Sequence, residues 1–257
     1  MPILSRTDNA GVATLTMERP QARNALSMEL MNAMIGAFEA ISKDAAVKAV
    51  ILRGAGPAFC AGHDLKEMRA NPARTFMQQT FETCARLMLT ITKLRQPVIA
   101  EVHGIATAAG CQLVATCDLA VCADDSRFAT PGVNIGLFCS TPMVALTRAV
   151  GRKAAMSMLL TGDMVDAAEA VRIGLVNTAV PSSKLHETVE SLAGQIAAKS
   201  GRVVAIGKDA FNRQIDMTLE DAYTYAGAVM AENMMLRDAA EGIDAFLTKR
   251  KPTWCDS

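Results

Sequence analysis

The stretch that decides the fold, residues 96–123, reads QPVIAEVHGIATAAGCQLVATCDLAVCA. The apolar run 98–102 follows Pro97 and predicts a buried strand. Small residues then lead into a predicted helix from about Ala109, and residues 119–123 predict a further strand. Strand, turn and helix in succession indicate an α/β fold with mostly buried strands.

The same unit precedes this stretch. Alternation over 12–17 predicts a strand, and Ser27 opens an amphipathic helix. A short apolar run at 49–53, which a glycine-rich turn ends, predicts a second strand. Apolar residues at every third or fourth position predict a helix over 72–94.

The C-terminal part is predicted to be mainly helical. Asp166 begins a short helix, Gly174 ends it, and residues 175–180 predict an extended segment. Helical periodicity then continues over 181–249. The chain has no linker-like or low-complexity segment, so we do not expect separate domains.

Composition excludes several classes of function. The 257 residues contain 26 Lys and Arg against 26 Asp and Glu, so the protein lacks the basic field that nucleic acids and membrane surfaces require. No apolar run is long enough to span a membrane, and the first ten residues do not resemble a targeting segment. We therefore expect a cytoplasmic protein. The seven cysteines form no metal-binding pattern, so we expect reduced thiols and no metal.

Two glycine-containing segments could carry chemistry through their backbones. Residues 57–65 form a turn after a strand, and residues 104–112 lead into a helix start. Free N–H groups at such places can hold a polarised carbonyl oxygen. A plain loop and close helix packing are the alternatives that each segment leaves open when it is taken alone.

The order of these segments resembles the crotonase, or enoyl-CoA hydratase/isomerase, superfamily. The matching motifs cover the chain from Arg19 to Pro252, and within the family they are most similar to the enoyl-CoA hydratase domain-containing protein 3 type. They read FCAGHDL, QPVIAEVHGIATAAGCQL, CDLAV, FATPGVNIG, TRAVGRKAA and EGIDAFLTKRKP.

The resemblance implies a spiral of strand-strand-helix repeats over residues 1–195 and a C-terminal helical trimerisation region over 196–257. The expected assembly is a homotrimer or a dimer of trimers. The expected ligand is an acyl-CoA thioester, with coenzyme A as part of the substrate and no tightly bound cofactor.

Site residues follow from the resemblance position by position. The two backbone donors of an oxyanion hole would be His63 and Ala109. The coenzyme A site would comprise Arg23, Ala25, Leu26, Ala61, His63, Asp64, Leu65, Lys66 and Gly110, together with Phe246 and Lys249 reaching a neighbouring subunit's ligand.

The pattern of the family's hydratases is broken at both catalytic glutamates. Gln112 and Gly132 occupy those positions, and neither can accept a proton from water near neutral pH. Asn134 and Cys139 are the remaining candidate groups on the loop that walls the acyl pocket. The His63 triplet GHD also occurs in methylmalonyl-CoA decarboxylase of the same family.

Two functions therefore remain open. In the first, the protein turns over an acyl-CoA thioester through a stabilised enolate, nominally as a hydratase/isomerase relative, or as a decarboxylase or thioester hydrolase. In the second, it binds acyl-CoA without turnover. Product formation from any thioester distinguishes the two.

Overall fold

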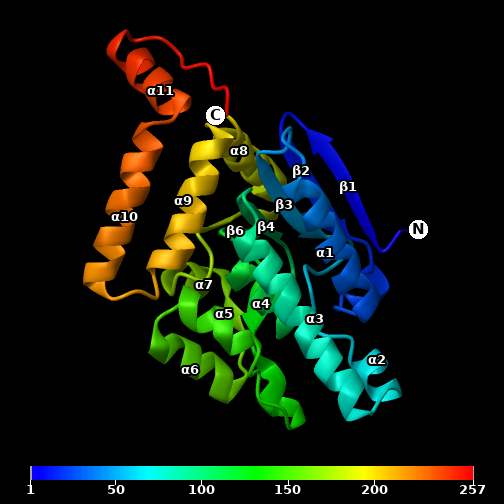
Figure 1. Ribbon diagram of the computed structural model, residues 1–257. Helices are drawn as coiled ribbons and strands as arrows, with labels where there is room; N and C mark the ends of the chain where they lie inside the picture. Colours follow the sequence, from blue (N-terminus) through cyan, green and yellow to red (C-terminus); the bar gives the residue numbers. More distant parts are fainter. Residues whose placement is uncertain (1, 257) are drawn as a thin grey trace.

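The computed structural model describes residues 2–256 and contains a six-stranded main sheet. Its strand order is β1-β2-β3-β4-β6-β9, and β1 pairs antiparallel with β2 whereas the other neighbours are parallel (Figure 1). The strands are β1 (Leu4–Asn9), β2 (Val12–Met17), β3 (Ala49–Gly54), β4 (Val98–Val102), β6 (Leu119–Ala123) and β9 (Thr178–Val180).

Helices cover both faces of this sheet, which explains why its central strands are continuously apolar. In β3, Val50 and Leu52 belong to the large core, whereas Ala49 and Ile51 belong to a smaller core that includes Val189 of α8 (Leu185–Ala197). Each parallel strand therefore contributes to two hydrophobic layers.

A second, three-stranded sheet lies beside the predicted site. It contains β5 (Ile105–Thr107), β7 (Arg127–Ala129) and β8 (Val165–Asp166). β5 is parallel to β7, and β7 is antiparallel to β8. The sheet leads into α4, because β5 ends two residues before that helix begins.

Local signals determined several helix starts. The side chain of Ser27 caps α1 (Met28–Ser42), and that of Asp166 caps α7 (Ala167–Arg172). The helix predicted over 72–94 is α3 (Arg74–Lys93), and α4 spans Ala109–Thr116. α1 packs on α3, and both cover the large core.

Several elements differ from the sequence prediction. β1, β5, β7, β8, α2 (Leu65–Ala70), α5 (Pro142–Ala149) and α6 (Arg152–Thr161) were not predicted. β1 shows no clear alternation, since its last four residues are exposed, and α2 is too short for a visible period. The extended segment predicted over 175–180 is a strand only at Thr178–Val180, and Leu175 and Val176 lie in a bend before it.

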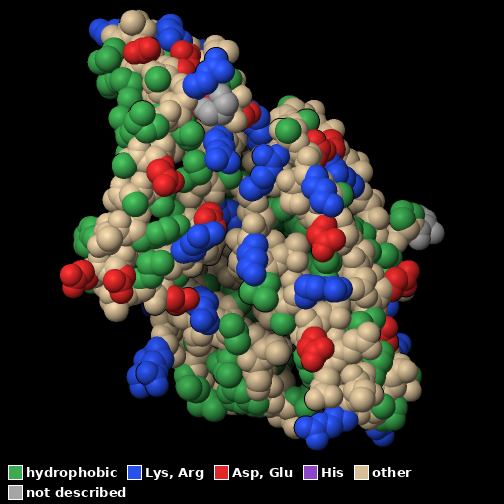
Figure 2. Space-filling model, in the orientation of Figure 1, with side chains coloured by type: hydrophobic (Ala, Val, Ile, Leu, Met, Phe, Trp, Pro, Cys, Tyr) green, Lys and Arg blue, Asp and Glu red, His purple; other side chains and the backbone are tan. Residues whose placement is uncertain are grey.

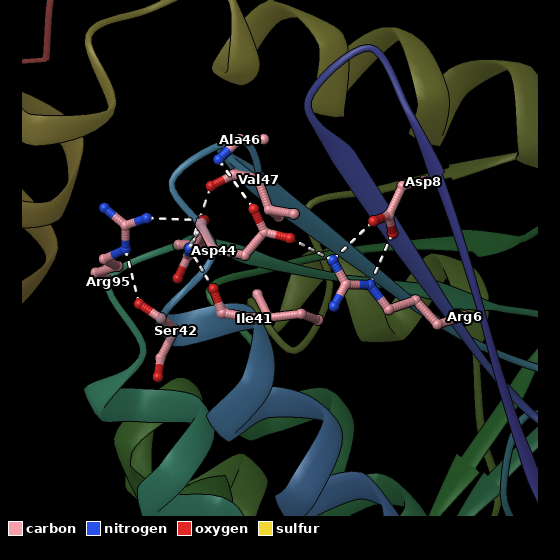
Figure 3. Close-up of polar contacts among 9 residues, drawn as sticks. Arg6, Asp8, Ile41, Ser42, Asp44, Ala46, Val47 and Arg95 are labelled. Atoms are coloured by element: carbon pink, nitrogen blue, oxygen red, sulfur yellow. Dashed lines mark hydrogen bonds and ion pairs between the residues drawn. The ribbon is translucent and has the colours of Figure 1, made fainter.

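The turn after α1 shows how the polar strand β1 is held (Figure 3). Arg6 donates to Asp8 and to Asp44, the latter at 2.8 Å. From the other side, Arg95 donates to the carbonyl oxygens of Ser42 and Asp44. Charged side chains thus connect β1 to the turn and to the segment before β4.

Three further helices follow α8: α9 (Gly201–Gln214), α10 (Leu219–Met234) and α11 (Arg237–Leu247). α10 packs on α9 and α11, and none of its residues is buried. Hydrophobic side chains lie exposed along α10 and α11 (Figure 2). No helix in residues 2–256 has the length and apolarity of a membrane span.

Candidate active site

The predicted coenzyme A residues lie on two loops that pair with each other. Leu26 N donates to the Gly62 carbonyl at 2.7 Å, and Asp64 N donates to the Leu26 carbonyl at 3.1 Å. Ala61 N donates to the Arg23 carbonyl at 3.0 Å. The structure therefore brings together Arg23, Ala25 and Leu26 with Ala61, His63, Asp64, Leu65 and Lys66, although these residues are far apart in the sequence.

Arg19 holds this pair of loops and was not predicted as a site residue. Its guanidinium binds the Asp64 carboxylate at 2.7 Å and donates to the Ala25 carbonyl. Asp64 also caps α2 through the N–H groups of Lys66 and Glu67. Burial alone would raise the pKa of Asp64, but the hydrogen bonds from Arg19 and Glu67 outweigh it and the pKa is lowered. Asp64 is therefore an ionised structural anchor.

The second glycine-containing segment lies directly against the first. Cys60 N donates to the Ile105 carbonyl, and Thr107 N donates to the Cys60 carbonyl at 3.0 Å. A Cβ atom on Gly62 would lie 3.4 Å from Ala109 N. A Cβ atom on Gly110 would lie 2.1 Å from the Cys60 carbonyl oxygen, so only glycine allows this approach.

Two neighbouring backbone N–H groups lack an acceptor within the part of the chain that the structure describes. They belong to His63 and to Ala109, the first residue of α4. Ala108, directly before Ala109, has φ of 50° and ψ of −117°, a backbone conformation that non-glycine residues rarely adopt. The positive end of the α4 dipole lies at the same place. The arrangement can hold an oxygen atom that carries partial negative charge.

One face of α3 contacts both His63 and Gln112. The Cys84 thiol donates to Gln112 Oε1 at 3.8 Å, and the His63 ring meets Phe81 edge-on with 5.4 Å between ring centroids. Burial raises the pKa of the Cys84 thiol to about 12 and lowers the pKa of His63 to about 4. Both groups are therefore uncharged at neutral pH. Sequence reasoning had placed Phe81 and Cys84 on a packing face and had missed this contact.

The loop after β7 closes over Gly132. A Cβ atom there would lie 2.8 Å from the Leu137 carbonyl oxygen and 3.0 Å from Cys139 Sγ. Cys139 is buried, which raises its pKa, although a backbone hydrogen bond at Gly132 opposes the shift. Burial likewise raises the pKa of Cys111 to about 12. Neither thiol is ionised at neutral pH, so neither has the thiolate form of a nucleophile.

Asn134 and Thr130, near the same loop, differ in their exposure to solvent. Asn134 is exposed, and its Nδ2 atom lies 2.9 Å from where a Cβ atom of Gly162 would be. Thr130, which sequence reasoning missed, is buried, and its hydroxyl has no hydrogen-bond partner in residues 2–256.

Phe246 and Lys249 do not join the other predicted residues within one chain. Phe246 is 82% exposed near the end of α11, and Lys249 lies just after that helix. α11 and α2 lie at opposite ends of the molecule (Figure 1). Any role of these two residues at a coenzyme A site therefore requires a second chain.

Two further acids, Asp118 and Glu101, are paired with basic side chains, and the surface clefts lie away from the predicted site residues. Asp118 binds Lys208 at 2.6 Å, and Glu101 binds His186 at 3.2 Å. A cleft of about 440 Å³ lies beside Glu101, and one of about 350 Å³ lies between α1 and α3. Neither cleft contains a predicted site residue. Residues 2–256 hold no cluster of three or more His, Cys, Asp or Glu side chains suited to a metal ion.

Comparisons with known proteins agree with this architecture. The family model for enoyl-CoA hydratase/isomerase matches residues 7–257. The mitochondrial enoyl-CoA hydratase domain-containing protein 3 of Rattus norvegicus is 45% identical over 98% of this chain and 84% of its own length. The corresponding human protein is 46% identical over 95% of this chain and 80% of its own length.

Solved structures give the same result. An enoyl-CoA hydratase from Mycobacterium smegmatis is 54% identical, with a TM-score of 0.97 over 99% of both chains. Human enoyl-CoA hydratase domain-containing protein 3 is 44% identical, with a TM-score of 0.96 over 98% of this chain and all of that chain. The predicted crotonase-type α/β fold and the predicted resemblance are thus confirmed.

The predicted cytoplasmic location is wrong by this comparison, because relatives from rat, Xenopus laevis and human are named mitochondrial. The prediction rested on net charge and on the first ten residues. Net charge governs solubility and association, and it does not determine the compartment in which a protein works.

Fold, motif order and relatives agree over nearly the whole chain, and the protein belongs to the enoyl-CoA hydratase/isomerase family.

Proposed function

We propose that the protein acts on an acyl-CoA thioester by holding the thioester oxygen between the N–H groups of His63 and Ala109. The observation that carries this proposal is that both N–H groups are adjacent and lack an acceptor in the described chain. Two such donors at a helix N-terminus stabilise the negative charge that develops on the oxygen as an enolate or tetrahedral intermediate forms. This electrostatic contribution needs no charged side chain.

The reaction proposed is one that does not require paired carboxylates. Gln112 replaces one acid with an amide, and the space at Gly132 is taken by Leu137 and Cys139. Decarboxylation and thioester hydrolysis both use a stabilised oxygen, and decarboxylation forms its enolate without a general base. Decarboxylation therefore needs neither acid of the pair, and thioester hydrolysis needs a base for water but no acid at the α-carbon, whereas standard hydration needs both.

Coenzyme A would bind along the paired loops. Arg23, Ala25, Leu26, Ala61, Asp64, Leu65 and Lys66 would line it, with Gly110 allowing α4 to approach. No separate cofactor is needed, because coenzyme A enters as part of the substrate.

The proposed assembly is a homotrimer or a dimer of trimers. Its support is the exposed apolar surface of α10 and α11, together with the remote position of Phe246 and Lys249. A neighbouring chain would cover that surface and receive those two side chains at its coenzyme A site. Light scattering on the purified protein should give three or six times the chain mass of 27.3 kDa.

The second candidate is a protein that binds acyl-CoA without turnover. It is favoured by the replacement of both acids and by the uncharged state of His63, Cys84 and Cys111. Such a protein would retain coenzyme A ligands and return them unchanged.

Mass spectrometry separates the candidates. The protein is incubated with enoyl-, malonyl-type and saturated acyl-CoA thioesters, beside a heat-inactivated control. Loss of carbon dioxide or release of free coenzyme A supports the proposal. A water adduct would show that hydration survives without the two glutamates. Bound but unchanged thioesters would support the non-catalytic binder.

A pair of proline variants tests the backbone donor. Ala109→Pro removes the N–H at the first position of α4, where proline is tolerated in helices, and should lower turnover by about 10²-fold. Leu219→Pro makes the same change at the first position of α10, where Leu219 is exposed, and should leave turnover unchanged. Melting temperatures confirm that both variants are folded. Full activity in a folded Ala109→Pro protein would exclude this donor.

A further inference from the structure

The amide oxygen of Gln112 faces the Cys84 thiol. Its Oε1 atom accepts the hydrogen bond from the Cys84 thiol, and its Nε2 atom donates to no residue in the described chain. The thiol remains protonated because burial raises the pKa of Cys84 to about 12. Cys84 therefore always offers a donor to the amide oxygen, and the NH₂ end of Gln112 is the end left for another partner.

Gln112 lies on the same side of α4 as the proposed oxyanion donor. Ala109 and Gln112 are three residues apart, so their side chains share one helix face, with about one turn between them. A thioester oxygen held at Ala109 N–H places the α- and β-carbons of its acyl group within about one helical turn, roughly 5 Å, of that donor. An amide one turn further along α4 is therefore within reach of a substituent on the β-carbon.

A second uncharged polar group, the His63 ring, contacts the same face of α3 as Gln112. His63 Nε2 is buried and has no hydrogen-bond partner within residues 2–256. Phe81 and Cys84 lie three residues apart on α3, so the contacts of His63 with Phe81 and of Gln112 with Cys84 converge on one helix face. A buried polar atom without a partner is costly, and a ligand atom would remove that cost.

Two carboxylates next to these segments are already paired with basic side chains. Asp64 is bound to Arg19, and Asp118 is bound to Lys208. Where hydratases of the family carry an acceptor for water protons, this chain presents amide donors. The amide of Gln112, which can donate a hydrogen bond, thus replaces a carboxylate, which can only accept one when it is ionised.

From this convergence we infer that the preferred acyl group carries an oxygen acceptor on its β-carbon, a carboxylate or a ketone, and that Gln112 donates to it. Gln112 is then a specificity-determining residue, and Cys84 is a positioning residue that orients its amide. The inference rests on the proposed function, because it assumes a thioester held at the N–H groups of His63 and Ala109.

Binding measurements with three thioesters test the inference. Isothermal titration gives Kd for malonyl-CoA, acetoacetyl-CoA and butyryl-CoA. The last two share a four-carbon acyl chain and differ in the β-oxygen, and malonyl-CoA carries a carboxylate as its third acyl carbon. The wild type should bind malonyl-CoA or acetoacetyl-CoA about tenfold more tightly than butyryl-CoA. Gln112→Leu should remove that preference, mainly by raising Kd for malonyl-CoA and acetoacetyl-CoA. Gln112→Glu should weaken malonyl-CoA more than acetoacetyl-CoA if the natural substituent is a carboxylate, because like charges repel.

Two variants of Cys84 test its positioning role. Cys84→Ser keeps a donor to the amide oxygen and should retain the preference. Cys84→Ala frees the amide to turn and should reduce the preference while butyryl-CoA binding stays constant. A purely structural role of Cys84 would instead change all three Kd values together.

The outcomes distinguish this inference from the proposed function. Mass spectrometry of the same samples records product. Equal Kd values for the three thioesters, with product formed, overturn the inference alone. A clear preference without any product supports the inference and contradicts turnover. Failure to bind any of the three thioesters overturns both.

Discussion

At the scale of the single residue, His63 couples the candidate site to pH. Burial lowers its pKa from 6.5 to about 4, so between these values the unfolded chain binds a proton that the native chain does not. The free energy of unfolding should therefore fall as pH decreases from 6.5 to 4, by about 3 kcal/mol over the whole window. This contribution is fully present above pH 6.5.

His63→Gln removes that titration. The variant should lose less stability than the wild type between pH 7 and pH 5, by about 2 kcal/mol in urea unfolding. His103→Gln controls for the substitution itself. An identical pH dependence in His63→Gln and the wild type would show that His63 is not buried in its neutral form.

A second prediction at the residue scale concerns Gly132. Gly132→Glu should not create hydratase activity, because its Cβ atom would meet the Leu137 carbonyl and Cys139 Sγ at 2.8 and 3.0 Å. The variant should instead lose about 1–3 kcal/mol of stability. Gly151→Glu is the matched control, since no atom lies within 4 Å of a Cβ there. Hydration of crotonyl-CoA by a stable Gly132→Glu protein would contradict this reading of the loop.

At the scale of the element, Lys208 connects α9 to the core. Its buried ammonium donates to Asp118 at 2.6 Å and to the carbonyl oxygens of Ile91 and Gln96. Burial raises the pKa of Asp118, and Lys208 opposes that shift. Removing the lysine would leave the Asp118 carboxylate without its counter-charge and two carbonyl oxygens without their donor.

Lys208→Met should therefore lower the free energy of unfolding by about 3 kcal/mol. Arg213→Met breaks the exposed pair with Asp209 on the same helix and should cost less than about 0.5 kcal/mol. The double change Lys208→Met with Asp118→Leu should recover part of the loss. Equal effects of Lys208→Met and Arg213→Met would show that the Lys208–Asp118 pair does not anchor α9.

At the scale of the whole molecule, the C-terminal tail fixes the position of α11. The buried Asp238 carboxylate accepts from Ser200 Oγ at 2.5 Å and from the N–H groups of Cys255 and Asp256. Trp254 Nε1 donates to the Ala198 carbonyl at 2.9 Å. The tail thus links α11 to the start of α9.

Asp238→Ala should release the tail. Trp254 is the only tryptophan, so its fluorescence should shift to longer wavelength as the indole gains contact with water. Stability should fall by about 1–3 kcal/mol, since several donors lose their acceptor. Asp244→Ala, on the exposed side of α11, is the control. An unchanged spectrum in Asp238→Ala would mean that other contacts hold the tail.

By itself, the sequence determined those features whose cause is local. The apolar face of α1 and its cap at Ser27 follow from neighbouring residues, as does the buried run of β4. The order of the motifs also predicted the family and the residues of the paired loops. The division at residue 195 and the assembly stay predictions.

Only the tertiary structure decided which distant residues meet. The polar strand β1 forms because β2 supplies its hydrogen-bond partners, and no periodicity in its sequence announces that pairing. Cys84 meets Gln112 across 28 positions, and Lys208 meets Asp118 across 90. Hydrophobic periodicity shows which face of an element is buried, but not what lies against it. The state of Gln112 as an oriented donor depends on that partner, and so it appears only when the chain is folded.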